Sequence, residues 1–106
     1  MEPIAVFVVA ADHPALPGHF PGRPVVPGVT LLDEALAAVH ATYGRTAPLR
    51  LLRVKFTAPA APGERITVLA RHTHPDTLQL SCVADARQVL AAVIRFDDAS
   101  PVDGRR

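Results

Sequence analysis

A histidine and a carboxylate are spaced in this sequence so that they could share one site. His19 opens a run rich in proline and glycine, His-Phe-Pro-Gly-Arg-Pro-Val-Val-Pro-Gly, which ends at Gly28. Asp33 follows fourteen residues after His19, inside an apolar stretch. Proline fixes φ and glycine allows close approach of the backbone, so such a run specifies one loop shape. A histidine on a rigid loop that leads into a helix favours acid–base chemistry beside a carbonyl-binding backbone.

Each of these three residues also has a purely structural interpretation. His19 could cap a turn, but its surroundings favour a base that removes a proton at pH 7. Asp33 could simply favour the positive end of a helix, although Glu34 fits that role better because it can turn toward solvent. We expect Asp33 to be buried, where an unpaired carboxylate is costly, so a hydrogen-bonded or functional role is indicated. Gly28 could serve a turn, while its N–H could also bind a carbonyl oxygen.

The expected elements place this loop between a strand and a helix. Residues 4–10 are β-branched, aromatic and apolar, which predicts a strand buried on both faces. Residues 29–43 predict a helix that ends at Gly44. The apolar stripe of this helix comprises Leu32, Leu36, Val39 and Tyr43. Alanines fill most of its other sides, so we expect it to be buried on several faces.

Four further strands are expected after the helix. They span Leu49 to Phe56, Arg65 to Arg71, Leu78 to Cys82, and Gln88 to Phe96. In the first of them, alternation places Leu52, Val54 and Phe56 on one face, opposite Arg53 and Lys55. One strand, one buried helix and four meandering strands predict a single α+β domain over residues 1–106 with an antiparallel sheet.

Composition excludes several classes of function. The net charge of +1 gives no electrostatic case for nucleic-acid binding. No apolar run reaches the roughly 20 residues that span a bilayer, and the N-terminus lacks the basic region of a signal peptide. A single cysteine, Cys82, cannot form an internal disulfide. We therefore expect a cytoplasmic protein.

The run from His19 to Gly28 resembles the β-hydroxyacyl-acyl-carrier-protein dehydratases. Their pattern reads His-Phe-Pro-Gly-x-Pro-x-x-Pro-Gly, with an acidic residue fourteen positions after the histidine, and every fixed position is present here. The acid is aspartate in the β-hydroxydecanoyl branch, which Asp33 matches. The similarity resumes more weakly over residues 54–59 and 62–64. In its compact length, the chain is similar to the dehydratase-like proteins of secondary fatty-acid or aryl-polyene pathways.

The resemblance implies a hotdog fold, in which a curved antiparallel sheet wraps around a central helix. It implies a homodimer whose active sites lie at the subunit interface, with His19 from one chain and Asp33 from the other. The implied reaction removes water from a 3-hydroxyacyl thioester to give the trans-2-enoyl thioester. In that reaction His19 takes the α-proton, Asp33 positions the β-hydroxyl, and the Gly28 N–H holds the thioester carbonyl. No cofactor and no metal is implied.

A second group of residues is expected to contact the substrate or to shape the acyl tunnel. It comprises Phe20, Pro24, Val26, Val29 and Ala37. For those in the loop, core packing is an equal alternative. Ala37 is a departure from the family, whose members often carry glutamine four residues after the acid. His40, one turn further on, could reach the same face.

The substrate implied by the resemblance is carried on the phosphopantetheine arm of an acyl carrier protein, or on coenzyme A. Carrier proteins are acidic, so basic residues are expected to form a docking patch. The candidates are Arg23, Arg50, Arg53, Lys55 and Arg71.

Two alternatives stay open from the sequence. One is another reaction on the same fold, such as enoyl hydration, double-bond isomerisation or thioester hydrolysis. The other is a non-catalytic module that binds acyl thioesters, which the Ala37 departure favours. The remaining histidines (His13, His72 and His74) lack the convergent spacing of a zinc site, and Cys82 is expected to lie in the core.

Overall fold

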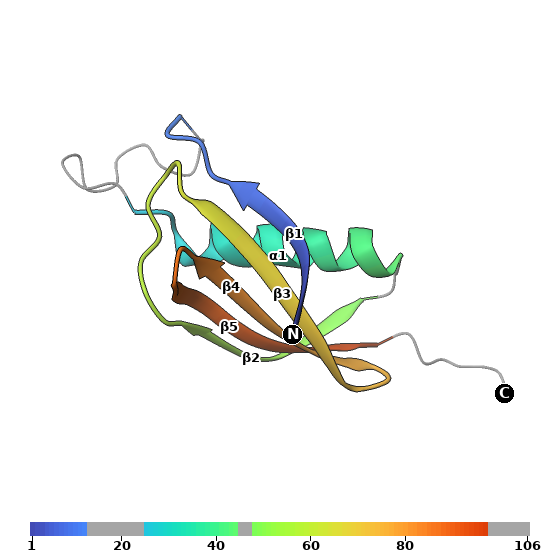
Figure 1. Ribbon diagram of the computed structural model, residues 1–106. Coiled ribbons are helices and arrows are strands. Elements are labelled where there is room, and N and C mark those ends of the chain that lie inside the picture. The colour runs from blue at the N-terminus through green and yellow to red at the C-terminus, as the bar shows by residue number, and fades with distance from the viewer. Residues whose placement is uncertain (13–24, 45–47, 98–106) are drawn as a thin grey trace, which may run out of the picture.

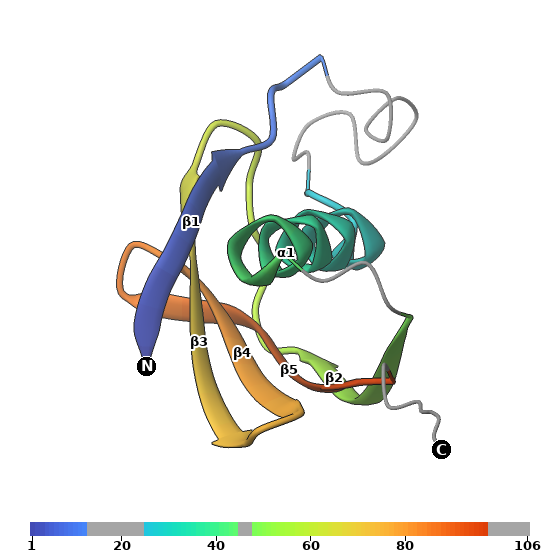
Figure 2. The ribbon, with the colours of Figure 1, turned by 90° about the vertical axis from the view of Figure 1, so that its right-hand side faces the viewer.

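The computed structural model describes residues 1–12, 25–44 and 48–97 of the chain. One helix lies across one face of a curved five-stranded antiparallel sheet (Figures 1 and 2). The elements in chain order are β1 (Glu2–Val8), α1 (Gly28–Tyr43), β2 (Leu49–Phe56), β3 (Arg65–His74), β4 (Thr77–Ala84) and β5 (Arg87–Phe96). The predicted α+β architecture, with one helix between the first and second strands, is confirmed.

The strand order is β1-β3-β4-β5-β2, and every neighbouring pair is antiparallel. Strands β3, β4 and β5 form the expected meander through short turns. The prediction that β2 belongs to the same meander is wrong, because β2 pairs with β5 at the opposite edge from β1. The chain therefore leaves one edge of the sheet, crosses its inner face as α1, and returns to the sheet at the other edge (Figure 2).

Helix α1 is buried along one side only. Its buried residues are Thr30, Leu31, Ala35 and Val39, and it contacts β1, β4 and β5. The opposite side is exposed at Val29, Asp33 and Ala37, which follow one another at i, i+4 and i+8. Burial on several faces is therefore wrong for the single chain, because the sheet covers only one side of the helix. Gly44 ends the helix in the left-handed conformation (φ 63°), as predicted.

The core lies between the helix and the inner face of the sheet. Alternation in β3, β4 and β5 turns every second side chain inward, and these side chains are almost fully buried. They include Ile66, Val68, Leu78, Leu80, Cys82, Leu90 and Ile94. Burial raises the pKa of the Cys82 thiol to about 11. Cys82 is thus a protonated core residue, as the sequence predicts.

Both edge strands differ from expectation. Strand β1 pairs only with β3, and Val6 and Val8 are half-exposed, so the predicted burial on both faces is wrong. In β2, the register shifts between Leu51 and Arg53, which leaves Leu52 in a bulge. Leu52 is 47% exposed, and it lines a depression together with side chains of the outer face. Its predicted position on the same face as Val54 is therefore wrong.

The same substitution at two leucines tests this division between core and bulge. Leu80→Ala removes a buried side chain from β4 and is expected to lower the free energy of unfolding by about 2–5 kcal/mol. Leu52→Ala is expected to lower it by less than about 1 kcal/mol, because its side chain is half in water. Urea denaturation of both variants measures the difference. Equal losses would contradict the bulge.

Candidate functional site

An apolar cavity of about 480 Å³ lies at the N-terminal end of α1. One wall comes from residues that lead into the helix, and the other comes from the end of β2 and the residues after it. The lining residues are Val25, Val26, Gly28, Val29, Leu31, Phe56, Thr57, Ala58 and Pro59. Three of the predicted site residues, Val26, Gly28 and Val29, therefore meet at one cavity. The volume and apolar lining suit a small-molecule site that accepts a hydrocarbon chain.

Gly28 is the first residue of α1, as expected, and it is packed against the ring of Phe56. A Cβ atom at position 28 would lie 2.7 Å from Cε1 of that ring, which is closer than real Cβ atoms approach. A side chain at position 28 would therefore displace the ring of Phe56, and its absence allows the aromatic ring to lie against the helix N-terminus. Phe56, in one wall of the cavity, therefore contacts Gly28 in the other.

The first turn of α1 brings two backbone amides, those of Gly28 and Val29, to this cavity. The amides of Thr30 and Leu31 donate to the Pro27 carbonyl at 3.0 and 3.3 Å, and no side chain caps the helix. The amides of Gly28 and Val29 have no acceptor among the described residues. Both residues line the cavity, where the helix dipole adds positive potential. This arrangement suits a ligand oxygen that carries negative charge.

Residues 57–64, which connect β2 to β3, form the second wall, and we call them the wall segment. The Val26 amide donates to the Ala60 carbonyl at 2.8 Å, two residues before the helix begins. The Gly63 amide donates to the Val9 carbonyl at 2.9 Å. The wall segment therefore holds the chain on both sides of the predicted histidine loop. Sequence reasoning gave these residues no site role, although residues 54–59 and 62–64 carried part of the family resemblance.

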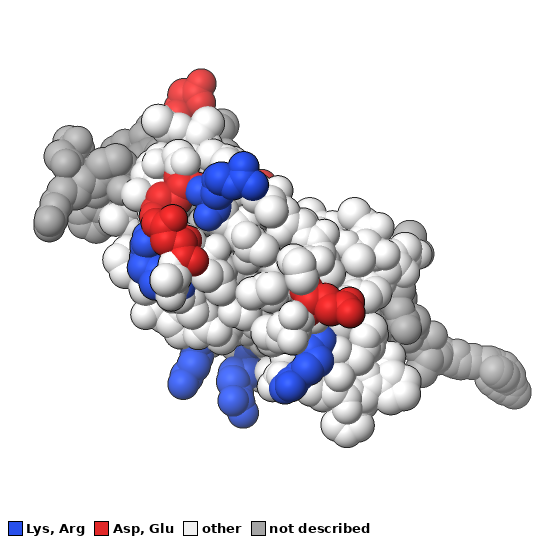
Figure 3. Space-filling model, in the orientation of Figure 1, with Lys and Arg blue, Asp and Glu red and all other residues white. Residues whose placement is uncertain are grey.

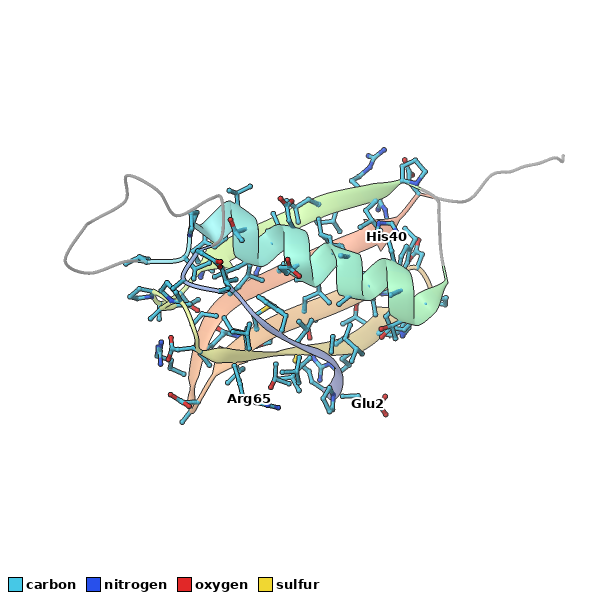
Figure 4. The ribbon with its side chains drawn as sticks, turned by 90° about the horizontal axis from the view of Figure 1, so that it is seen from above. Glu2, His40 and Arg65 are labelled. Atoms are coloured by element: carbon cyan, nitrogen blue, oxygen red, sulfur yellow. The ribbon has the colours of Figure 1, made fainter. Side chains whose placement is uncertain are left out.

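Asp33 lies one helical turn after Val29, about 6 Å further along the axis. It is exposed, lies outside the lining of the cavity, and has no ion pair or hydrogen bond with a described residue. The expectation that Asp33 is buried is therefore wrong for the single chain. Its neighbour on the same face, Ala37, is exposed as well. His40 lies nearer the other end of α1 and is half-buried (Figure 4).

Three predicted site residues, His19, Phe20 and Pro24, and the predicted docking residue Arg23 lie outside the described residues. Their roles stay predictions from the sequence. Over the part of the chain that is described, no three histidine, cysteine, aspartate or glutamate side chains gather in a way that could hold a metal ion. Within the same residues, the helix is too short and too little apolar to cross a membrane.

Comparison with known families matches residues 2–93 to the ApeI-like family, described as ApeI dehydratase. Among solved structures, a chain of the dehydratase heterocomplex ApeI:P from Xenorhabdus doucetiae superposes with a TM-score of 0.72 at 20% identity. The match covers 85% of this chain and 81% of that one. This likeness confirms the predicted hotdog fold.

Curated relatives carry the name 3-hydroxyacyl-[acyl-carrier-protein] dehydratase FabZ. The protein from Syntrophomonas wolfei is 36% identical over 74 residues, which are 61% of this chain and 51% of that protein. The protein from Bartonella henselae is 28% identical over 102 residues, 86% of this chain and 66% of that protein. The protein from Ehrlichia ruminantium is 32% identical over 101 residues, 83% of this chain and 69% of that protein. The chain thus spans between half and about two thirds of their length.

The contact between Gly28 and Phe56 can be tested by a double-mutant cycle. Gly28→Ala is expected to lower the free energy of unfolding by about 1–3 kcal/mol, because the new Cβ overlaps the ring. Phe56→Ala removes all the overlapping atoms, so the double variant should recover about 1 kcal/mol relative to the sum of the single changes. Urea denaturation of the four proteins gives the coupling energy. Strict additivity would show that the two residues do not touch.

Proposed function

The chain belongs to the ApeI-like dehydratase family, and we propose that it removes water from 3-hydroxyacyl thioesters to give trans-2-enoyl thioesters. The observation that carries the proposal is a pair of amides, those of Gly28 and Val29, which line an apolar cavity and have no acceptor among the described residues. A thioester needs both features, because its carbonyl oxygen gains charge during the reaction while its acyl chain avoids water. The reaction belongs to fatty-acid or polyene-type biosynthesis.

The elimination proceeds through an enolate-like arrangement held by the helix N-terminus. The Gly28 N–H binds the thioester carbonyl oxygen and lowers the energy of the negative charge that develops there. His19 takes the proton from the α-carbon. The electron pair of that C–H bond forms the α–β double bond as the β C–O bond breaks. The departing hydroxyl, oriented by Asp33, receives the proton back from His19 and leaves as water. Base, acid and carbonyl-binding group are all protein groups, so the proposed reaction uses no cofactor.

The remaining predicted residues fit this scheme as substrate contacts. Val26 and Val29 line the cavity and take the acyl chain by apolar contact. Phe20 and Pro24 belong to the same loop as His19, and we keep them as predicted tunnel residues. Ala37 is exposed one turn after Asp33, where it leaves the carboxylate without the amide neighbour that the family pattern often supplies.

We propose that the protein acts as a homodimer in the cytoplasm. Asp33 is exposed in the single chain, and β2 is an edge strand with a half-exposed apolar margin at Leu51 and Phe56. Pairing this edge with β2 of a second copy would cover that margin, and the family resemblance implies that Asp33 then serves a site with His19 of the other copy. The Xenorhabdus structure is a heterocomplex, so a different hotdog partner is the alternative that the experiment below also reports.

The first test follows enoyl absorbance on 3-hydroxyacyl thioesters with His19→Ala and Asp33→Asn variants. Each is expected to lower kcat by about 10²–10⁴-fold, because each removes one proton-transfer or positioning group. Mixing the two inactive variants, with exchange of subunits, should restore about a quarter of wild-type activity. Half of the dimers are then mixed, and each mixed dimer keeps one intact site if the two groups come from different chains.

Three outcomes would change the assignment. No activity in the mixture, with mixed dimers present, would place His19 and Asp33 of each site on one chain. Release of free thiol in place of a conjugated double bond would make the protein a thioesterase. Binding of acyl thioesters without turnover, for the homodimer alone, would favour the acyl-binding module or a subunit that needs a catalytic partner.

The acyl carrier protein is the proposed substrate carrier, with coenzyme A as the alternative. Basic side chains project from the margin of the molecule that β2 forms (Figure 3). Arg53 and Lys55 alternate with inward residues of β2, and neither forms an ion pair with a described residue. Arg50 is paired with Asp97 at 3.5 Å, and Arg71 donates to Gln79. Arg53 and Lys55 are therefore the cations most available to an acidic partner near the cavity.

Charge reversal separates the two carriers. Lys55→Glu is expected to raise KM about tenfold for a substrate on the carrier protein, because a favourable charge contact becomes repulsive. It should leave KM for the same acyl group on coenzyme A within about twofold, because surface charges contribute mainly to protein docking. Arg65→Glu is the matched control, since Arg65 pairs with Val8 at the opposite edge of the sheet (Figure 4). Equal changes in both variants, or in both substrates, would contradict docking at β2.

A further inference from the structure

We propose that Arg87 and Glu64 are positioning residues, which hold the wall segment so that Gly28 and the cavity wall keep their reactive geometry. Neither residue lines the cavity. The sequence analysis assigned no function to either of them. The inference rests on the proposed dehydration for its kinetic part. Its structural part, that the pair fixes the wall segment, is tested without turnover.

One guanidinium spans most of the wall segment. Arg87 is the first residue of β5, and its Nε and Nη2 donate to the Pro59 carbonyl at 3.3 and 3.2 Å. Its Nη2 also donates to Oε1 of Glu64 at 2.5 Å. The same Glu64 oxygen accepts the Ala61 amide at 2.8 Å. Charge-assisted hydrogen bonds of this kind are shorter and stronger than neutral ones, so the pair ties residue 59 to residue 64 across the turn.

The beginning of the wall segment is tied to the same strand. The Thr57 amide donates to the Val89 carbonyl at 3.1 Å, and its hydroxyl donates to the Gln88 carbonyl at 2.7 Å. Both ends of the wall segment are thus fastened to the first three residues of β5. Between these attachments, Ala60 is buried in the core. The wall segment is therefore an extension of the rigid sheet and not an independent loop.

This attachment reaches the site through one backbone contact. Pro59, held by Arg87, lines the cavity, and its neighbour Ala60 accepts the amide of Val26. Val26 precedes Gly28 by two residues and lines the cavity too. Loss of Arg87 releases the Pro59 carbonyl, which loosens the acceptor that fixes the entry to α1. Misplacement of catalytic groups by about 1 Å can cost on the order of 10²-fold in rate.

The charges of this cluster set its dependence on pH. The hydrogen bond from Arg87, and next the Ala61 amide, lower the pKa of the Glu64 carboxyl. A carboxyl whose pKa is lower in the folded state stabilises the fold above its unfolded pKa, near 4.5, and this stabilisation is lost as pH falls through the lower, folded value. The other charge facing Arg87 is Asp85, at 3.9 Å and well exposed. At neutral pH the pair is therefore fully charged.

The experiment compares Arg87→Met and Glu64→Gln with matched controls. Arg95→Met and Asp97→Asn make the same chemical changes near the other end of β5, away from the wall segment. Amide hydrogen exchange is followed at Val26 and Gly63, and turnover is measured with a coenzyme A thioester so that carrier docking does not contribute. Both test variants should exchange at these amides at least about tenfold faster, because local opening becomes easier. Leu80 in β4 should exchange as in the wild type.

In the same variants kcat should fall about 10–100-fold with KM changed less than about threefold. The controls should match the wild type, and Arg87→Lys should recover part of both effects. In the wild type, the Val26 amide should become less protected from exchange as the pH falls below about 4.5. In Glu64→Gln its protection should not change over this pH range, because the group that titrates is gone.

The outcomes separate this inference from the proposed function. Unchanged exchange at Val26 in both variants would overturn the inference, whether or not the wild type is active. Faster exchange with unchanged kcat would overturn it also, because the pair would then hold the wall segment without serving the reaction. A fall in kcat for Arg87→Met alone would show that Arg87 acts without Glu64 and would overturn the pairing. A wild type with no turnover, but with faster exchange in both variants, would sink the dehydratase proposal and leave the structural part supported.

Discussion

The ring of Phe56 lies against the first residue of α1, and any side chain at position 28 would force that ring to shift. This contact sets where the helix begins relative to the end of β2. The amides of a first helical turn have no partner within the helix and are free to bind a ligand. The place where the helix begins therefore decides where the site lies. With Phe56 on one side and the Val26–Ala60 hydrogen bond on the other, these amides lie beside an apolar cavity. The rest of the site depends on that placement.

Local patterns in the sequence predicted most of the fold. The alternation in β3 to β5 and the glycine stop involve residues within a few positions of one another, and both were confirmed. The helix stripe was only partly right, because Val39 is buried whereas Leu32, Leu36 and Tyr43 are partly buried against the core. The errors concern partners distant in sequence. Nothing within residues 4–10 shows that β1 will be an edge strand, and nothing near Leu52 shows that β5 imposes a bulge. Likewise, the extent of helix burial depends on how many layers cover it, which the helix sequence does not encode.

The candidate site divides in the same way. The residues of the loop and helix start form one continuous motif, so Gly28, Val26 and Val29 were predicted and the structure brings them together at the cavity. The second wall was missed as a wall, because Phe56 and Pro59 meet Gly28 only after the chain has crossed the sheet. The Arg87–Glu64 pair joins residues 23 positions apart, and ion pairs of this range leave no periodic signal in a sequence.

The exposure of Asp33 constrains what a single copy can do. A carboxylate in water is already hydrogen-bonded to solvent, so it orients a substrate hydroxyl poorly until water is excluded. In the single chain the Phe56 ring lies against Gly28, while the next turn of the helix is exposed at Asp33. The apolar edge of β2, at Leu51 and Phe56, is uncovered as well. A second chain that covers both would complete the site, and it would do so with the same unpaired edge that otherwise invites aggregation. In the proposed function, assembly and catalysis would therefore depend on each other.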